Sequence, residues 1–313
     1  MSPLASIIVL THDRPALLTH SVASALDQTV SDVEVLILGD GVTEAVRSSA
    51  TALAADARVR FLDYPKGPHR GEVHRDTAIR EATGNAIFYL CDDDLLLPSH
   101  VESLLELLKT HTFAQSKNCW VDEGGQIRPY VADLSSPETI AWHLRDDIRY
   151  NAVSVTGTAH RRDFYLESNQ PWSTTPSGEW PDHFEWRKLF AQPSFSGATS
   201  ARVTALQFPN TSSDRAEWTE EQRVAELERW EAIIAAPDGS ARIEELYNAG
   251  TLRYLEFVVF AERAGALELN AASVAAERAR AALDDLHGSR SWKLTAPLRG
   301  LGAIARRVRR GAR

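Results

Sequence analysis

The stretch FYLCDDDLLLP, Phe88–Pro98, joins an apolar run to three consecutive aspartates and then to three leucines. Adjacent carboxylates repel one another, so Asp92, Asp93 and Asp94 either form a solvated turn that begins a helix or surround a cation. The apolar run before them is typical of a buried strand, and Pro98 favours a helix start directly after it. The stretch therefore predicts a strand, an acidic turn and a helix in succession.

The first hundred residues repeat this order of strand, turn and helix. Strand-like runs occupy residues 5–11, 33–41, 58–65 and 85–91, and each is followed by apolar residues at helical spacing. This alternation predicts an α/β domain with a mainly parallel sheet that is flanked by helices. Ligands bind beyond the carboxyl ends of such strands, so we expect the polar residues after them to share one rim.

The alternation weakens after the fourth strand. We predict one domain over residues 1–212, with a ligand-binding half at 1–110 and a second half at 111–212. A helical extension follows over 213–287, beginning near Asp214, and its pattern is interrupted at Gly250 and Gly265. The last segment, 288–313, is a basic tail.

Composition excludes several classes of protein. The chain has 313 residues, 43% of them hydrophobic and 25% charged, so wholesale disorder is not expected. Cys91 and Cys119 lack metal-ligand spacing, and no apolar run reaches the roughly 18 residues of a membrane span. We therefore expect a cytoplasmic protein, soluble or peripheral at the inner face of a membrane.

The net charge of −9 is unevenly distributed along the chain. The final 26 residues are basic, because they carry eight Lys or Arg and no Asp or Glu. Such a tail can lie on anionic lipid as an amphipathic helix, or bind an acidic protein or the acidic body of the same chain. Nucleic acid is disfavoured, because no aromatic interleaving or nucleic-acid-binding motif accompanies the charge.

The acidic turn suits a hard divalent cation. Asp92 and Asp94 stand two residues apart after a strand and can point to the same side. A Mg²⁺ or Mn²⁺ ion held by one or two carboxylates keeps positions for substrate phosphates. The aspartates alone do not separate this interpretation from a helix start decorated with acids.

The order of the motifs resembles the inverting family-2 glycosyltransferases with the GT-A (Rossmann-like) fold. SIIVLTHDRPALL, DVEVLILGDG and RDTAIREATGNAIFYL lead into DDD at spacings similar to that family's. The resemblance implies a nucleotide-diphospho-sugar donor and Mn²⁺ or Mg²⁺ at Asp94 and Asp92. It also implies donor-binding roles for the following residues: Thr11, Asp13, Arg14, Asp40, Arg75, Asp92 and Asp93.

The stretch GEWPDHFEWRKLF, residues 178–190, resembles the family segment that supplies the catalytic base, and Asp182 matches that base. Glu185 lies one helical turn later and is the reserve candidate. His183 is either a metal ligand or a surface histidine. Trp172 and Trp180, in loop-like sequence, are candidates for contact with an acceptor sugar, whereas the spacing of Trp186 favours core packing.

Four residues depart from the family pattern: Gly39, Asp76, Cys91 and Pro181. We expect transfer of a UDP-, dTDP- or GDP-linked sugar to a glycan, a lipid-linked glycan or a small-molecule hydroxyl, in bacterial glycan or glycoconjugate synthesis. The alternative is a non-catalytic relative that binds sugar nucleotides or acts as a scaffold. A dinucleotide-dependent oxidoreductase is disfavoured, because no Gly-x-Gly-x-x-Gly follows the first strand. A nucleotidyltransferase is disfavoured, because that strand is not followed by a Gly-rich basic loop.

Overall fold

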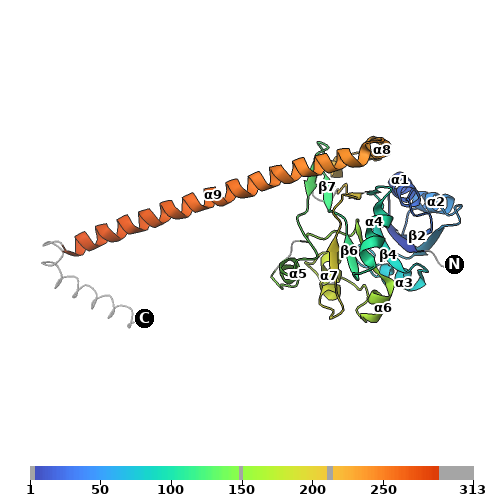
Figure 1. Ribbon diagram of the computed structural model, residues 1–313, viewed down its shortest axis with the longest axis horizontal. Coiled ribbons are helices and arrows are strands. Elements are labelled where there is room, and N and C mark those ends of the chain that lie inside the picture. Colours follow the sequence, from blue (N-terminus) through green and yellow to red (C-terminus); the bar gives the residue numbers. More distant parts are fainter. Residues whose placement is uncertain (1–3, 148–150, 210–213, 289–313) are drawn as a thin grey trace, which may run out of the picture. The chain divides into compact units, whose positions relative to one another are not determined.

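The computed structural model describes residues 4–147, 151–209 and 214–288 (Figure 1). Residues through Leu252 form one compact unit, and residues from Arg253 onward form a second. The first unit contains all the predicted site residues. The helix α9 (Gly239–Gly288) begins in the first unit and continues into the second.

A seven-stranded sheet lies at the centre of the first unit, in the order β10-β6-β9-β4-β1-β2-β3. Strands β1, β2, β3 and β4 are parallel, and β9 runs antiparallel between β4 and β6. Their bounds are β1 (Ala5–Thr11), β2 (Val33–Asp40), β3 (Val59–Tyr64), β4 (Ala86–Cys91), β6 (Phe113–Gln115), β9 (Thr158–Arg161) and β10 (Gly197–Thr199). The predicted α/β domain with a mainly parallel sheet is confirmed.

Helices cover both faces of the sheet (Figure 1). One face packs on α1 (Pro15–Leu26), α2 (Glu44–Leu53) and α4 (His100–Leu108), and the other on α3 (His74–Glu81), α6 (Arg162–Glu167) and α7 (Pro181–Phe190). Side chains alternate between these two cores along each strand, because successive residues of a strand point to opposite faces. Ile7 and Val9 of β1 lie in the first core, and Ile8 lies in the second.

Short strands and a further helix build a third core beside the sheet. The strand pairs are β5 (Leu95–Leu96) with β11 (Ala205–Leu206) and β7 (Cys119–Val121) with β8 (Ile127–Pro129), while α5 (Pro137–His143) lies near α7. Leu227 and Trp230 of α8 (Glu220–Ala235) pack here with Leu17 of α1. The predicted helical extension thus begins inside the same compact unit, and the functional boundaries at 212 and 287 remain predictions.

Two details of the predicted extension are wrong. A 3₁₀ turn (Asp214–Glu217) replaces the predicted helix start, and α8 begins after Thr219, whose side chain forms a capping box with Gln222. The helix α9 also runs through Gly250 and Gly265 without interruption. At Gly250 a Cβ would stand 2.2 Å from the carbonyl oxygen of Ile127, so glycine permits close packing there rather than a break.

The basic tail lies at 289–313, outside the described residues apart from its first glycine. Its predicted contacts with lipid or protein therefore stay predictions. In the described part of the chain, every helix is too short or too polar to cross a membrane.

Candidate functional site

The acidic turn, Asp92–Asp94, follows β4 and meets the end of β1. Thr11 donates a hydrogen bond of 2.8 Å from its hydroxyl to Asp92 Oδ2. Arg14, just before α1, donates from Nη1 to Asp92 Oδ1 at 3.1 Å and to Asp93 Oδ2 at 2.8 Å. These contacts join the carboxyl ends of two adjacent parallel strands, which is where α/β sheets bind ligands. Thr11 and Arg14 therefore lie with the acidic turn, as predicted.

A second guanidinium reaches the acidic turn from α8. Arg223, 4% exposed, donates from Nη2 to Asp93 Oδ2 at 3.2 Å and to the carbonyl oxygen of Phe208 at 2.9 Å. No local pattern predicted a site role for this residue, which lies 130 positions from Asp93. Among the described residues no donor is assigned to Asp93 Oδ1, so this oxygen is open to a ligand.

Asp94 has a different environment from Asp93. Its Oδ2 accepts a hydrogen bond of 2.5 Å from the Thr156 hydroxyl, and its Oδ1 accepts one of 2.8 Å from the backbone N–H of Phe208. Both carboxylate oxygens thus have partners within the fold, and the side chain is buried. Asp94 thus joins the acidic turn to Thr156, which lies before β9, and to Phe208, which lies after β11. Its role as a metal ligand stays a prediction.

The acidic turn places three carboxyl groups beside two arginines. Burial, followed by the charge of Asp93, raises the pKa of Asp92 to about 6 and that of Asp94 to about 8. Arg14 and the Thr11 hydroxyl oppose the shift at Asp92, and Thr156 and the Phe208 N–H oppose it at Asp94. A bound cation would relieve this repulsion.

Asp40, at the end of β2, is 2% exposed and holds the loop that follows β3. Its oxygens accept from Lys66 Nζ and, at 2.6 Å, from the Gly67 N–H, and His74 lies 3.3 Å away. Burial alone would raise the pKa of Asp40, but these hydrogen bonds and charges lower it overall. The predicted donor-binding role of Asp40 stays a prediction.

Arg75 of α3 is a buried cation without a carboxylate partner. It is 7% exposed, its guanidinium lies 4.7 Å from the centre of the Trp172 ring, and the described residues give it neither a hydrogen bond nor an ion pair. A buried guanidinium normally has an anionic partner, so this one is available to an anionic ligand.

Trp172 lies in the core and not at an acceptor surface. It is 3% exposed, and its indole N–H donates to the Tyr89 hydroxyl at 3.1 Å. The expected contact of Trp172 with an acceptor is corrected by this burial. Trp186 is fully buried beside it, as its helical spacing predicted.

The α7 carboxylates, Asp182 and Glu185, form a second acidic group. Pro181 opens α7, so Asp182 stands in its first turn. Asn151 donates to Asp182 Oδ2 at 2.8 Å, and the His183 N–H donates to Oδ1 at 3.1 Å. Burial raises the pKa of Asp182, and these hydrogen bonds and the charge of Arg75 oppose the shift. Arg75 therefore lies within electrostatic range of Asp182.

Glu185 is more deeply buried than Asp182. It is 0% exposed and forms an ion pair with Lys188. Burial raises the pKa of Glu185 to about 7, with Lys188 and Arg75 opposing the shift. His183 is also buried, 6.0 Å from the ring of His143, so the expectation of a surface histidine is wrong.

Two predicted residues remain exposed. Trp180 is 48% exposed and lies 5.4 Å from the Arg70 guanidinium, so its face is accessible to a sugar. Asp13 is exposed and lies 4.0 Å from Arg14, at the rim and not in the acidic turn. Contact of Trp180 with an acceptor and binding of the donor by Asp13 stay predictions.

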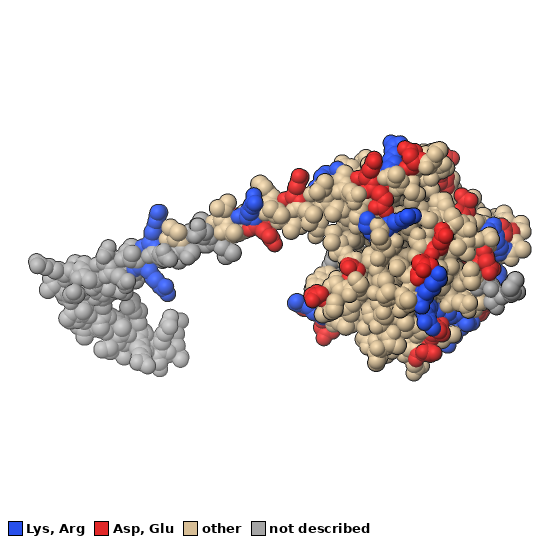
Figure 2. All heavy atoms as spheres, in the orientation of Figure 1, with Lys and Arg blue, Asp and Glu red and all other residues tan. Residues whose placement is uncertain are grey.

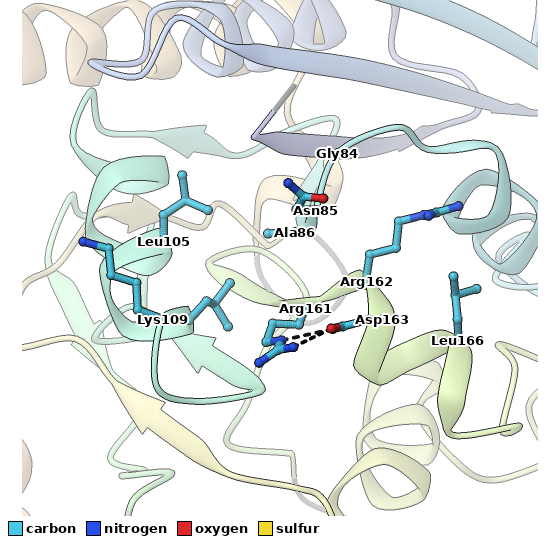
Figure 3. Close-up of a pocket in the computed structure, with 10 residues that line it drawn as sticks. Gly84, Asn85, Ala86, Leu105, Lys109, Arg161, Arg162, Asp163 and Leu166 are labelled. Carbon is cyan, nitrogen blue, oxygen red and sulfur yellow. Dashed lines mark hydrogen bonds and ion pairs between the residues drawn. The ribbon is translucent and has the colours of Figure 1, made fainter. Parts of the chain in front are cut away.

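A cavity of about 400 Å³ lies elsewhere, at the amino-terminal end of β4 (Figure 3). Leu105 and Leu108 of α4 line one side, and Arg161, paired with Asp163, lines another. The acidic turn stands at the opposite, carboxyl end of β4. The cavity is therefore separate from the candidate site.

Comparison with known proteins agrees with the geometry. The family model described as "Glycosyl transferase family 2" matches residues 6–160. Over 132 residues the chain is 26% identical to the GalNAc(5)-diNAcBac-PP-undecaprenol beta-1,3-glucosyltransferase of Campylobacter jejuni, covering 40% of this chain and 41% of that one. It is 36% identical over 105 residues to the chondroitin synthase of Escherichia coli, covering 33% of this chain and 15% of the relative. The chain thus aligns with less than half the length of either protein.

Solved structures share the fold. S. aureus TarS 1-349 superposes with a TM-score of 0.53 at 14% identity, over 81% of this chain and 72% of that one. The structure of the same TarS segment in complex with UDP-GlcNAc has a TM-score of 0.51 at 15% identity, over 81% and 73%. At these identities the likeness concerns the GT-A fold alone.

Proposed function

Because the chain belongs to glycosyltransferase family 2, we propose that it transfers a sugar from a nucleotide-diphospho-sugar to a hydroxyl acceptor with inversion at C1. The observation that carries the proposal is the placement of Arg75. This buried cation has no anionic partner among the described residues and is electrostatically close to Asp182. An anionic donor and a candidate base therefore share one site.

The donor would lie along the carboxyl ends of β1 and β4. Arg75 would contact the diphosphate directly. The open oxygen of Asp93 would bind a cation that contacts the diphosphate. Thr11 and Arg14 position Asp92 and Asp93 from the neighbouring strand. Arg223 acts as a positioning residue, because it holds Asp93 Oδ2 and so orients Oδ1.

A divalent cation fits the acidic turn. Asp93 Oδ1 has no assigned donor among the described residues, and carboxylate oxygens are the ligands that Mg²⁺ and Mn²⁺ prefer. Asp93 would hold the ion, with Asp92 beside it. When bound, such an ion supplies positive charge that neutralises the leaving diphosphate.

The transfer step requires a base on the side of the sugar opposite the diphosphate. The acceptor oxygen forms a bond to C1 while the bond from C1 to the phosphate oxygen breaks, and the nucleoside diphosphate leaves with the electron pair. Asp182 takes the hydroxyl proton, and its raised pKa favours this transfer. Glu185, one turn further along α7, is the alternative candidate for the base.

The acceptor class follows from relatives only by analogy. One matched relative is named as acting on an undecaprenol-linked substrate and another as a chondroitin synthase, so both names refer to glycan synthesis. We propose a glycan or lipid-linked glycan acceptor at the α7 carboxylates, with Trp180 as a stacking surface.

A panel of UDP-, GDP- and dTDP-sugars tests this function. Thermal shift with and without Mn²⁺ or Mg²⁺ measures donor binding, and release of nucleoside diphosphate measures turnover. We expect a cation-dependent shift and turnover with one nucleotide class. Binding without turnover on any acceptor would favour the non-catalytic alternative, and absence of both would contradict a donor site here.

A further inference from the structure

Large apolar side chains are exposed on α9 beyond Leu252. Phe257, Phe260 and Leu267 are 69%, 76% and 70% exposed, and Val274 is 40% exposed. Phenylalanine and leucine at such exposure mark a contact surface in a soluble protein. The proposed function uses none of these residues, which belong to the second unit of the chain.

Their spacing is that of a coiled-coil seam. Residues 257, 260, 264, 267, 271 and 274 are separated alternately by three and four positions, as the core positions of a heptad are. The first position of each heptad holds Phe257 and then two alanines, and the fourth holds Phe260, Leu267 and Val274. This seam spans about five turns, or about 27 Å of helix.

The charges beside the seam argue against anionic lipid and nucleic acid. From Arg253 to Glu268 the helix carries two arginines and three glutamates. Figure 2 shows blue and red side chains interspersed along the described part of α9. A surface that binds anionic lipid or nucleic acid carries an excess of basic residues instead.

The same charges favour a second copy of this chain in parallel orientation. Arg263 directly precedes one seam position and Glu268 directly follows the next. In a parallel pair these flanking positions face each other, so Arg263 of each copy meets Glu268 of the other, twice by symmetry. In an antiparallel pair, positions that precede the seam face each other and positions that follow it face each other. Arg263 and Glu268 would then no longer pair between the two copies.

We propose that residues 257–274 of α9 form a parallel coiled coil with the same segment of a second copy of the chain. The seam supplies the apolar contact, and the two Arg263–Glu268 pairs set the direction. This inference rests on α9 alone and does not depend on the proposed function.

The mass of the full chain in solution tests the association. Light scattering should give about twice the 34.6 kDa of one chain, and the double variant Phe260→Glu, Leu267→Glu should halve that mass. The matched control, Val259→Glu with Ala266→Glu, puts the same charges off the seam and should leave the dimer intact. Circular dichroism checks that both variants keep their helix. A monomeric wild type, or a seam variant that stays dimeric, would overturn the proposal.

A cross-linking pair tests the direction. Phe260→Cys should form an inter-chain disulfide on mild oxidation, because in a parallel pair the two positions adjoin. Glu262→Cys, on the outer side, should not. Arg263→Glu should weaken the dimer, and the swap Arg263→Glu with Glu268→Arg should restore it. Cross-linking at position 262 but not 260, or a swap that fails to restore the dimer, would exclude this coiled coil.

Discussion

The two acidic groups of the site are held differently. In the acidic turn, five of the six carboxylate oxygens accept hydrogen bonds from the five partners Thr11, Arg14, Thr156, the Phe208 N–H and Arg223. The α7 carboxylates are supported by fewer contacts. Asp182 has one side-chain donor and one backbone donor, and Glu185 has Lys188.

The difference agrees with the two proposed roles, cation binding for Asp93 and proton transfer for Asp182. A carboxylate that must keep its charge and orientation for a cation benefits from guanidinium partners. A carboxylate that takes a proton benefits from burial without strong cationic partners, because burial raises its pKa toward neutrality. Asp93 matches the first description and Asp182 the second.

The largest expected effect is at Asp182. Replacing Asp182 with Asn removes the proton acceptor while keeping the hydrogen-bonding shape, so kcat should fall by about 10²–10⁴-fold with donor affinity unchanged. Steady-state kinetics and thermal shift measure the two quantities. Asp163→Asn, at the other end of the sheet, is the control. If Glu185→Gln instead gives the larger fall in kcat, Glu185 is the base.

The next effect separates the members of the acidic turn. Asp93→Asn should abolish the cation-dependent thermal shift and lower kcat/KM by about 10²–10³-fold. The reason is that the variant would not hold the cation that neutralises the leaving diphosphate. Asp94→Asn should retain the cation-dependent shift, since both Asp94 oxygens already bond within the fold. The opposite pattern would support Asp94 as the metal ligand, as the sequence predicts.

Glu185 should make folding stability depend on pH. Its pKa is about 7 in the folded state, above the ordinary value of 4.5, so the folded state holds a proton that the unfolded state releases. The stabilisation is fully present below about pH 4.5 and is lost as the pH rises through 7. Glu185→Gln should raise the unfolding free energy at pH 8, relative to wild type, by on the order of 3 kcal/mol.

Denaturant unfolding at pH 5 and pH 8, without ligand, measures this difference. The exposed Glu167→Gln on α6 is the control and should leave the pH dependence of wild type unchanged. Equal stability changes for Glu185→Gln at both pH values would show that Glu185 is ionised throughout.

The smallest expected effect is at Arg223, which donates a hydrogen bond to Asp93 from α8. Arg223→Gln should weaken cation and donor binding about tenfold, through loss of one charge-assisted hydrogen bond. Arg229→Gln, an exposed arginine on the same helix, should change neither. Thermal-shift titrations with Mn²⁺ and with the donor measure both. Equal behaviour of the two variants would remove Arg223 from the site.

Local sequence predicted the elements of the site but not their partners. The apolar strands and the acidic turn are local patterns, so Thr11, Arg14 and the three aspartates could be placed on one rim. Trp172 was misassigned because loop-like sequence does not reveal burial, and two-residue spacing does not show that both oxygens of Asp94 accept hydrogen bonds within the fold. Arg223 carried no local signal beyond a basic residue in an acidic helix.

Periodicity and turn residues act over short range, so the parallel α/β sheet, the rim of polar strand ends and the motif order that resembles glycosyltransferase family 2 could be predicted from the amino-acid sequence. Three features emerge from the packing of the chain: the open oxygen of Asp93, the lack of an ion pair for Arg75 among the described residues, and the contact of Arg223 on α8 with Asp93. The contacts of Arg223 with Asp93 and of Phe208 with Asp94 span 130 and 114 positions, and such hydrogen-bond partners meet only when the chain has packed.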